Sequence, residues 1–411
     1  MLILVLYLNK TNQMNNKRRN FLKKGAGVLG STLILPYNEV FSFINDSPNE
    51  TLQIGVIGTG SRGQGLMKII NDIANINVVA ICDTLNFRLN AASEIAPKAK
   101  KYNDHRNLLL NKDLDAVIIS TPLNTHASIA EDAIAADVHI YCEKTMVKGD
   151  EETLKLHETL KRNAKIIFQT GHQYHSSRLY SHIVDLINSG EIGLVSAVRA
   201  QYNRNADWRR SVPEPKYERQ INWRMYREYS YGLTAELSSH QIDFCNWFIG
   251  SNPLKVVGFG DVSYWKDGRE TYDNTHLIYS YRNGIKASFT CLTSNAKDNY
   301  KINVLGDKGS IIIDHYSAWQ YPEGKYEKKM GDVDGVSGAT ASWVEGKGIP
   351  IDYQHKEPSR QALEDFRSSI IDNKEPLSNF KTGAEVSFAV DMGIRAMDTN
   401  KVIEWENKYN I

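Results

Sequence analysis

A glycine-rich turn between an apolar strand and a helix is the feature that most narrows the folds open to this 411-residue chain. The apolar run 53–58 leads into the turn 58–63 (GTGSRG), and residues 63–73 continue with a helical pattern. Glycines allow a tight turn and a close ligand approach, while free N–H groups at the helix start attract phosphate. This order predicts a dinucleotide-binding Rossmann domain. The residues expected to hold its phosphates are Gly58, Gly60, Ser61, Arg62 and Gly63.

Short apolar runs alternate with helical patterns through the first part of the chain. Continuous apolar strands between amphipathic helices indicate a parallel sheet that is covered on both faces. The pattern therefore predicts an α/β class fold with an N-terminal Rossmann sheet. Its further strands are expected at 77–83, 116–120, 138–143 and 165–169.

The sequence pattern changes after Gly171. From there on, short strand-like runs are separated by glycine-containing turns such as Arg282-Asn283-Gly284. This pattern predicts a C-terminal α/β domain with a large, mostly antiparallel open sheet. We expect helices near 233–249 and 359–372 to cover one face of that sheet, and a final helix over 382–400. The strands are expected at 195–202, 255–262, 275–281, 286–291 and 301–305, and an exposed loop at 331–348.

These patterns divide the chain into three parts. Residues 1–50 are expected to be an export signal and linker. Residues 51–172 are expected to form the NAD-binding Rossmann domain. Residues 173–411 are expected to form a substrate and oligomerisation domain. The sequence leaves open whether the last helices of this domain pack on its own sheet or back on the Rossmann domain.

Asp83 lies twenty residues after Gly63, at the end of the second predicted strand. A carboxylate at this position accepts a hydrogen bond from the ribose 2′-hydroxyl and repels a 2′-phosphate, so NAD is expected over NADP. Arg62 and Arg88 are close in sequence and could reverse that preference.

Several short motifs in the right order resemble the Gfo/Idh/MocA oxidoreductases. They are the glycine turn, residues 120–126 (STPLNTH), Glu143-Lys144 and a later Glu-x-x-x-His at 236–240. The resemblance covers roughly residues 52–400. It implies that Thr121, Pro122, Asn124 and His126 line the dinucleotide, and that Glu143 and Lys144 reach its nicotinamide.

The resemblance also implies acid–base residues. Lys144 would assist proton transfer, with a pKa lowered in a partly dry cleft. His240 would take the substrate hydroxyl proton, and Glu236, on the same helix face, would position or bind the substrate. Many members of the family have proline where this chain has Thr145, so we expect a trans peptide bond after Lys144.

Aromatic and basic residues after the last Rossmann strand suggest a substrate pocket. Such side chains stack on sugar rings or clasp hydroxyl groups. Dense Trp/Arg stretches are as often an interface or a packed loop. The candidates for the pocket are Tyr174, His175, Arg204, Trp208 and Trp223.

The N-terminal segment has the layout of a signal peptide. Residues 17–23 (KRRNFLK) precede a weakly apolar stretch, 25–35, which is too short to cross a bilayer core because a spanning helix needs about 20 residues. The adjacent arginines resemble a twin-arginine signal, which implies a periplasmic enzyme that retains its cofactor. A disordered basic arm is the alternative interpretation.

The charge distribution argues against a nucleic-acid-binding protein, and the cysteine spacing argues against a zinc protein. The six basic residues before residue 25 account for the formal charge of +1, so the rest of the chain is mildly acidic and has no footprint for nucleic acid. The four cysteines, Cys82, Cys142, Cys245 and Cys291, lie too far apart for a zinc site, and we expect no metal.

The favoured function is hydride transfer between a tightly held NAD and a secondary hydroxyl of a sugar, glycoside or polyol. The first alternative is an NAD-dependent glycoside hydrolase or lyase that oxidises the sugar transiently and then eliminates the aglycone. The second is a non-catalytic protein that uses the same fold. An open sheet face also predicts a homo-oligomer, with a carbohydrate as small-molecule partner.

Overall fold

The computed structural model describes residues 51–323, 348–353 and 356–411. The predicted export segment, 1–50, lies outside the described residues, as does all of the predicted loop 331–348 except Gly348. Residues 52–411 form one compact unit.

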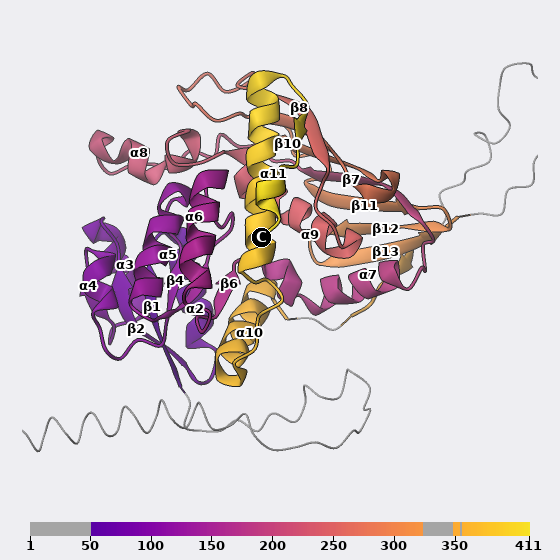
Figure 1. Ribbon diagram of the computed structural model, residues 1–411. Helices are drawn as coiled ribbons and strands as arrows, with labels where there is room; N and C mark the ends of the chain where they lie inside the picture. The colour runs from indigo at the N-terminus through magenta and orange to yellow at the C-terminus, as the bar shows by residue number, and fades with distance from the viewer. Residues whose placement is uncertain (1–50, 324–347, 354–355) are drawn as a thin grey trace, which may run out of the picture. The chain divides into compact units, whose positions relative to one another are not determined.

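The N-terminal part contains a parallel six-stranded sheet in the order β3-β2-β1-β4-β5-β6 (Figure 1). The strands predicted from apolar runs are confirmed, whereas β3 was not predicted because it is short, polar and at the sheet edge. The strands are β1 (Leu52–Ile57), β2 (Ile76–Cys82), β3 (Lys100–Tyr102), β4 (Ala116–Ile119), β5 (His139–Cys142) and β6 (Phe168–Thr170). The helices between them are α2 (Ser61–Asn71), α3 (Asn86–Ile95), α4 (His105–Leu109), α5 (His126–Ala135) and α6 (Asp150–Lys161).

The C-terminal part contains a nine-stranded sheet in the order β14-β13-β12-β11-β7-β10-β9-β8-β15. Its strand pairs are antiparallel except β7 with β10, so the expectation of a mostly antiparallel sheet is confirmed. The strands are β7 (Val195–Tyr202), β8 (Lys255–Asp261), β9 (Asn274–Ser280), β10 (Lys286–Leu292), β11 (Tyr300–Gly306), β12 (Gly309–Asp314), β13 (Ser317–Pro322), β14 (Ile349–Pro350) and β15 (Ile403–Glu404).

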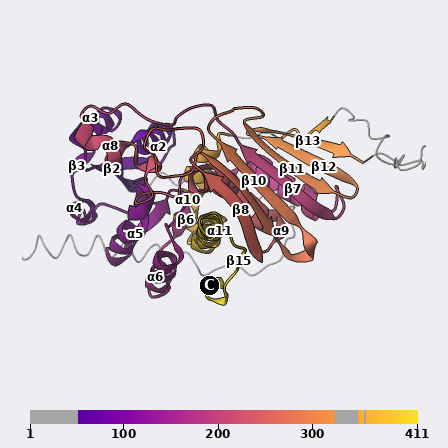
Figure 2. The same ribbon diagram turned by 90° about the horizontal axis from the view of Figure 1, so that it is seen from above.

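Helices cover one face of this sheet, and the other face is open (Figure 2). Alternate residues of β8 and β9, such as Val256 and Leu277, are buried beneath α9 (Ser239–Ile249) and α11 (Phe380–Thr399), with α7 (Arg178–Asn188) beside α9. Their neighbours Phe259 and Ile278 remain exposed. The period-2 alternation thus separates a packed face from an open one.

Helix α10 (Pro358–Asp372) corrects one expectation. Residues 359–372 were expected on the antiparallel sheet, but α10 packs against α2 and the 3₁₀ turn at Gln173–Ser176. Its apolar side chains Leu363 and Phe366 join the core of the parallel sheet, where the ring of Phe366 meets that of Tyr141 edge to face. An amphipathic pattern reveals that a helix has an apolar face but not which surface that face covers.

Helix α11 lies where the two sheets meet (Figure 1). It contacts β6 and α6 of the first part, and β8 and α9 of the second. Its near-continuous burial explains why the final helix was predictable from sequence. This helix joins the two sheets in one packed core, so the carboxyl ends of β5 and β6 face α9.

In the described ranges, no helix combines the length and the apolar character needed to cross a membrane. All four cysteines are buried as free thiols, and the described residues contain no cluster of His, Cys, Asp or Glu that could hold a metal ion.

Candidate active site

The glycine turn between β1 and α2 is closely packed. Gly58 has a φ of 90°, a conformation that favours glycine. A Cβ on Gly63 would overlap the carbonyl oxygen of Gly58 and lie 2.9 Å from Ser120 Oγ, which itself donates a hydrogen bond of 2.7 Å to that carbonyl. Gly60, by contrast, has only the Arg88 guanidinium within 4 Å of such a Cβ, at 3.6 Å. The turn therefore leaves open space on its outer side, where a phosphate would approach.

Asp83 fastens the end of β2 to this turn. Its carboxylate accepts hydrogen bonds from the backbone N–H of Thr59 at 2.8 Å, from the Thr59 hydroxyl at 3.2 Å and from the N–H of Leu85 at 2.9 Å. The side chain is largely buried beside the turn, and its contact with a ribose 2′-hydroxyl stays a prediction.

The two arginines considered for NADP recognition lie in different places. Arg62 turns inward, where Nε donates to Glu143 Oε1 at 2.7 Å and Nη1 donates to Ser359 Oγ at 3.1 Å. Arg88 instead lines a pocket beside Gly60. Arg62 is thus committed to an ion pair, and Arg88 is the one of the two that faces the phosphate turn.

The loops after β4 and β5 are tied together by His126. Its Nε2 lies 3.0 Å from the carbonyl oxygen of Thr121, and its Nδ1 lies 3.1 Å from that of Thr145. Thr121 also accepts a hydrogen bond from the Thr125 hydroxyl, and Pro122 precedes the 3₁₀ turn that contains Asn124. The Asn124 amide oxygen is buried without a partner among the described residues. His126 therefore links the loop after β4 to the loop after β5. The side-chain oxygen of Asn124 makes no hydrogen bond with the described residues and is available to a ligand.

Lys144 follows β5 and reaches the C-terminal part. Its Nζ donates a hydrogen bond of 2.6 Å to the carbonyl oxygen of Glu236, and the Thr145 hydroxyl donates one of 2.8 Å to the carbonyl of Ala235. The Lys144–Thr145 peptide bond is cis, so the expected trans bond is wrong. Proline has no hydroxyl, so Thr145 adds a contact at this position that proline lacks.

Burial lowers the pKa of Lys144, and the charges of Arg224 and Arg62 act in the same direction. Together they outweigh the opposing effect of Glu236 and Glu143. The amine is thus easier to deprotonate than an exposed lysine, which is useful for a group that exchanges protons.

Glu236 belongs to a π-helical segment, Thr234–Ser238, that runs into α9. Its carboxylate pairs with Arg224 Nε at 2.7 Å and accepts a hydrogen bond of 3.3 Å from the Ser230 hydroxyl. Burial alone would raise the pKa of Glu236, but Arg224 and Lys144 outweigh that effect and lower it. The group is held as a buried carboxylate beside Lys144.

His240 lies near Lys144 on the first turn of α9. Burial and the charge of Lys144 hold its pKa well below the usual range, so the imidazole is neutral at neutral pH. The ring of Tyr174 is 5.3 Å away and that of His172 is 5.9 Å away, measured between centroids. A neutral imidazole is the form that accepts a proton.

Tyr174 and His175 take different places. Tyr174 stacks on Tyr180 at 4.3 Å and faces His240. His175 points away, where Nε2 lies 3.0 Å from Asp243 Oδ1 and the ring stacks on Trp247. His172 belongs to the same segment, from which Tyr174 and His175 were preferred as pocket residues. It is fully buried, with no hydrogen-bond partner for either ring nitrogen among the described residues.

Burial lowers the pKa of His172 to about 4, and the nearest carboxylate oxygen, Asp243 Oδ1, lies 3.7 Å from its Nδ1, beyond hydrogen-bond distance. A buried imidazole without a hydrogen bond indicates a polar partner supplied from outside the chain.

The remaining predicted pocket residues form two aromatic groups. Arg204 donates to the Tyr202 hydroxyl at 3.1 Å and lies over the ring of Trp208 at 5.6 Å. Trp223 is buried with the Arg224 guanidinium 4.1 Å above its ring. Trp223 therefore acts on the site through Arg224, the partner of Glu236.

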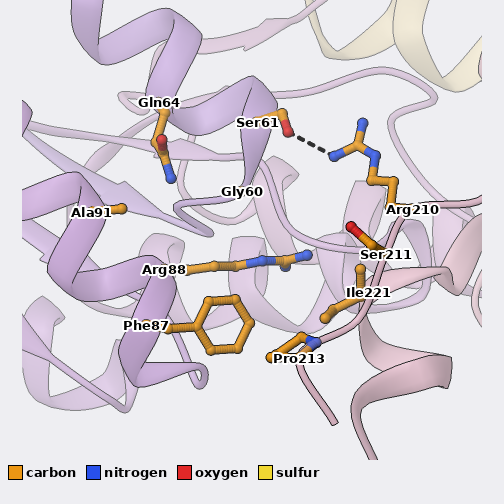
Figure 3. Close-up of a pocket in the computed structure, with 10 residues that line it drawn as sticks. All are labelled: Gly60, Ser61, Gln64, Phe87, Arg88, Ala91, Arg210, Ser211, Pro213 and Ile221. Atoms are coloured by element: carbon orange, nitrogen blue, oxygen red, sulfur yellow. Dashed lines mark hydrogen bonds between the residues drawn. The ribbon is translucent and has the colours of Figure 1, made fainter. Parts of the chain in front are cut away.

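A pocket of about 260 Å³ lies beside the glycine turn (Figure 3). Gly60, Ser61 and Arg88 form one wall, and Arg210, Ser211 and Pro213, from the C-terminal part, form the opposite wall. The open space at Gly60 and the two cationic side chains match the phosphate portion of a dinucleotide. Lys144 follows β5, which lies two strands from β1 in the same parallel sheet, and His240 lies on α9.

Arg210 and Arg224 lie in the Trp/Arg stretches whose role in the pocket the sequence left open, and neither was chosen as a candidate site residue. Arg210 donates a hydrogen bond of 2.6 Å to the Ser61 hydroxyl across 149 residues of sequence. The ion pair of Arg224 with Glu236 depends on how a loop folds over the helix.

Comparison with known proteins places these features in a family. Residues 52–172 match a family described as an oxidoreductase family with an NAD-binding Rossmann fold, and residues 180–312 match a Gfo/Idh/MocA C-terminal domain. Together the two matches cover more than half of the chain.

A curated relative agrees with this family assignment. An inositol 2-dehydrogenase from Salmonella typhimurium strain LT2 is 30% identical over 205 residues, which is 49% of this chain and 56% of that protein. The alignment thus spans about half the length of this curated relative.

Solved structures share the fold. A levoglucosan dehydrogenase in complex with NADH and levoglucosan has a TM-score of 0.69 at 19% identity, over 86% of this chain and 99% of that one. An aldose–aldose oxidoreductase from Caulobacter crescentus, complexed with glycerol, has a TM-score of 0.69 at 17% identity, over 86% and 100%. With the glycine turn, Lys144 and His240 arranged as described, the chain belongs to the Gfo/Idh/MocA family of oxidoreductases.

Proposed function

We propose that this protein is an NAD-dependent oxidoreductase that moves hydride between a retained cofactor and a secondary hydroxyl of a sugar, glycoside or polyol. The observation that carries the proposal is the meeting of Lys144 with Glu236 and His240. The first comes from the Rossmann part and the others from the C-terminal part. Lys144 follows β5, whose carboxyl end lies on the same edge of the parallel sheet as the glycine turn after β1, which supports a dinucleotide reaching from one to the other.

The side chains divide the proton chemistry. His240 is neutral and accepts the proton of the substrate hydroxyl. The buried amine of Lys144 assists this transfer, and Glu236, kept ionised by Arg224, orients a substrate hydroxyl. When NAD is bound, its nicotinamide accepts the hydride from the substrate carbon that carries this hydroxyl. Loss of the proton and the hydride turns the secondary alcohol into a ketone.

Carbohydrate chemistry is supported by the side chains around His240 and by the relatives. Next to His240, Tyr174 offers an aromatic face and His172 offers ring nitrogens that make no hydrogen bond with the described residues. The relatives described above are named for inositol, levoglucosan and aldoses. These substrates are all polyols or sugars with secondary hydroxyl groups.

We further propose that the protein is exported by the twin-arginine route to the periplasm, as its paired arginines Arg18 and Arg19 suggest. A periplasmic enzyme has no soluble nicotinamide pool, so oxidation and reduction would both occur on the same retained cofactor. Fractionation of the producing cells tests this, and protein confined to the cytoplasm would refute it.

We also propose a homo-oligomer that pairs through the open face of the nine-stranded sheet, where Phe259 is 69% exposed. Sedimentation of a Phe259→Asp variant beside the unchanged protein tests this pairing. Equal masses for the two would refute it.

The proposed activity can be tested on purified protein that carries its nucleotide. Sugars, glycosides and polyols are added singly, without a second acceptor, and the absorbance of reduced nicotinamide is followed. Dehydrogenase chemistry predicts absorbance that appears and persists at no more than one equivalent per chain. Release of free sugar from a glycoside without accumulated reduced cofactor would contradict the proposal and favour transient oxidation followed by elimination.

A further inference from the structure

Residues 207–222, here named the strap, run from the C-terminal part to the glycine turn of the Rossmann part (Figure 3). At its inner end Arg210 Nη1 donates a hydrogen bond of 2.6 Å to Ser61 Oγ. Near its outer end the ring of Tyr217 meets the ring of Phe87 edge to face at 5.8 Å. The strap thus forms the wall of the pocket that faces Gly60 and Arg88.

Hydrogen bonds within the strap hold Arg210, and an ion pair ties the strap to Asp267. The side chain of Asn222, 3% exposed, accepts from the N–H of Arg210 at 2.7 Å and donates to its carbonyl oxygen at 3.0 Å. Arg209 pairs with Glu218 and with Asp267. Arg210 is therefore fixed in place before any ligand is considered.

Two cations of this pocket have no carboxylate within ion-pair distance among the described residues: Arg88 and Arg210. The neighbouring Arg62 and Arg224 are already neutralised by Glu143 and Glu236. Burial lowers the pKa of Arg210, and the charges of Arg224 and Arg88 add to the effect. An anion placed between Gly60 and the strap would relieve this repulsion.

We propose that Arg210 binds the pyrophosphate of the dinucleotide and that the strap covers this part of the cofactor and slows its release. The inference rests on the proposed function, because it assumes that the glycine turn holds NAD. It adds a ligand from the C-terminal part to a site that the Rossmann part otherwise builds. The strap has to move away from Ser61 before the phosphates can leave.

The test compares Arg210→Gln with Lys216→Gln in the full chain. Both variants remove one positive charge from the strap, but Lys216 is exposed and pairs with Glu214. Each protein is loaded with NADH, and release is followed by its fluorescence after mixing with excess NAD. A charge-assisted hydrogen bond to phosphate predicts release about 10- to 100-fold faster in Arg210→Gln, and an unchanged rate in Lys216→Gln.

Arg210→Lys controls for a general loss of structure, because it keeps the charge but not the planar fork, and it should release NADH at an intermediate rate. The same series is repeated with NADPH. Pyrophosphate binding predicts equal acceleration for both nucleotides. Acceleration confined to NADPH would overturn the proposal, since it would place Arg210 on a 2′-phosphate.

The outcomes separate this inference from the proposed function. If the unchanged protein binds NADH and Arg210→Gln releases it at the same rate, the strap inference is wrong and the proposed function stands. If the unchanged protein binds no nicotinamide nucleotide, both are wrong.

Discussion

Replacing Lys144 with methionine should lower the turnover of the preferred sugar by about 10²-fold or more, while NADH still binds. The amine is buried at the junction of the two parts and bonded to the Glu236 carbonyl, where methionine fills the space but carries no proton. Steady-state rates and a fluorescence titration with NADH check the two halves of this expectation.

The pH dependence gives a second readout of the same variant. The pKa of Lys144 lies below the lysine value of 10.5 because of burial, so the free amine is available at lower pH than in an exposed lysine. Sugar oxidation should therefore fall as the pH drops through that lowered pKa, and this limb should vanish in Lys144→Met. The matched control is Lys155→Met, an exposed lysine on α6 paired with Glu131. Near-normal turnover in Lys144→Met would remove this residue from the mechanism.

Replacing Gly63 with alanine should abolish tight nucleotide binding and destabilise the fold. The new methyl group would overlap the Gly58 carbonyl and press on Ser120, so α2 has to move away from the turn. Overpacking of this kind costs about 1–3 kcal/mol of unfolding free energy. The displaced helix start should weaken NADH binding at least tenfold, a change of about 1.4 kcal/mol.

Gly65→Ala is the control for this substitution. It lies two residues further along α2, and a Cβ there has no heavy atom within 4 Å. Alanine in a helix interior is favoured over glycine by about 0.5–1 kcal/mol, so this variant should bind NADH normally and unfold at an equal or higher temperature. Equal behaviour of the two variants in thermal unfolding and NADH titration would contradict the packing described for the turn.

The parts of the fold that were predictable are those coded by local patterns. The strands β1, β4 and β5 are apolar runs with both faces largely buried, and the final helix α11 is buried along most of its length. The glycine turn and Asp83 were found because their spacing is fixed by one βαβ unit. The strand β3 was missed because three polar residues at a sheet edge have no apolar period.

The parts that were not predictable depend on contacts between distant segments. Arg62 was assigned to the phosphates, but it reaches Glu143 across the sheet, 81 residues away. Nothing local to Arg210 indicates Ser61, and nothing in residues 359–372 indicates that α10 covers α2. Glu236 and His240 were expected on a regular helix, whereas Glu236 lies in a π-helical turn that only the packing around Lys144 reveals.

The most direct test of the central claim is to follow the hydrogen itself. The exported protein, with its bound nucleotide, is mixed with a perdeuterated sugar that reduces it, and the nucleotide is then released and weighed by mass spectrometry. Hydride transfer from carbon to cofactor predicts NADH that carries one deuterium, in the unchanged protein and not in Lys144→Met. Reduced nucleotide without deuterium, or a protein that carries no nicotinamide nucleotide, would contradict the account.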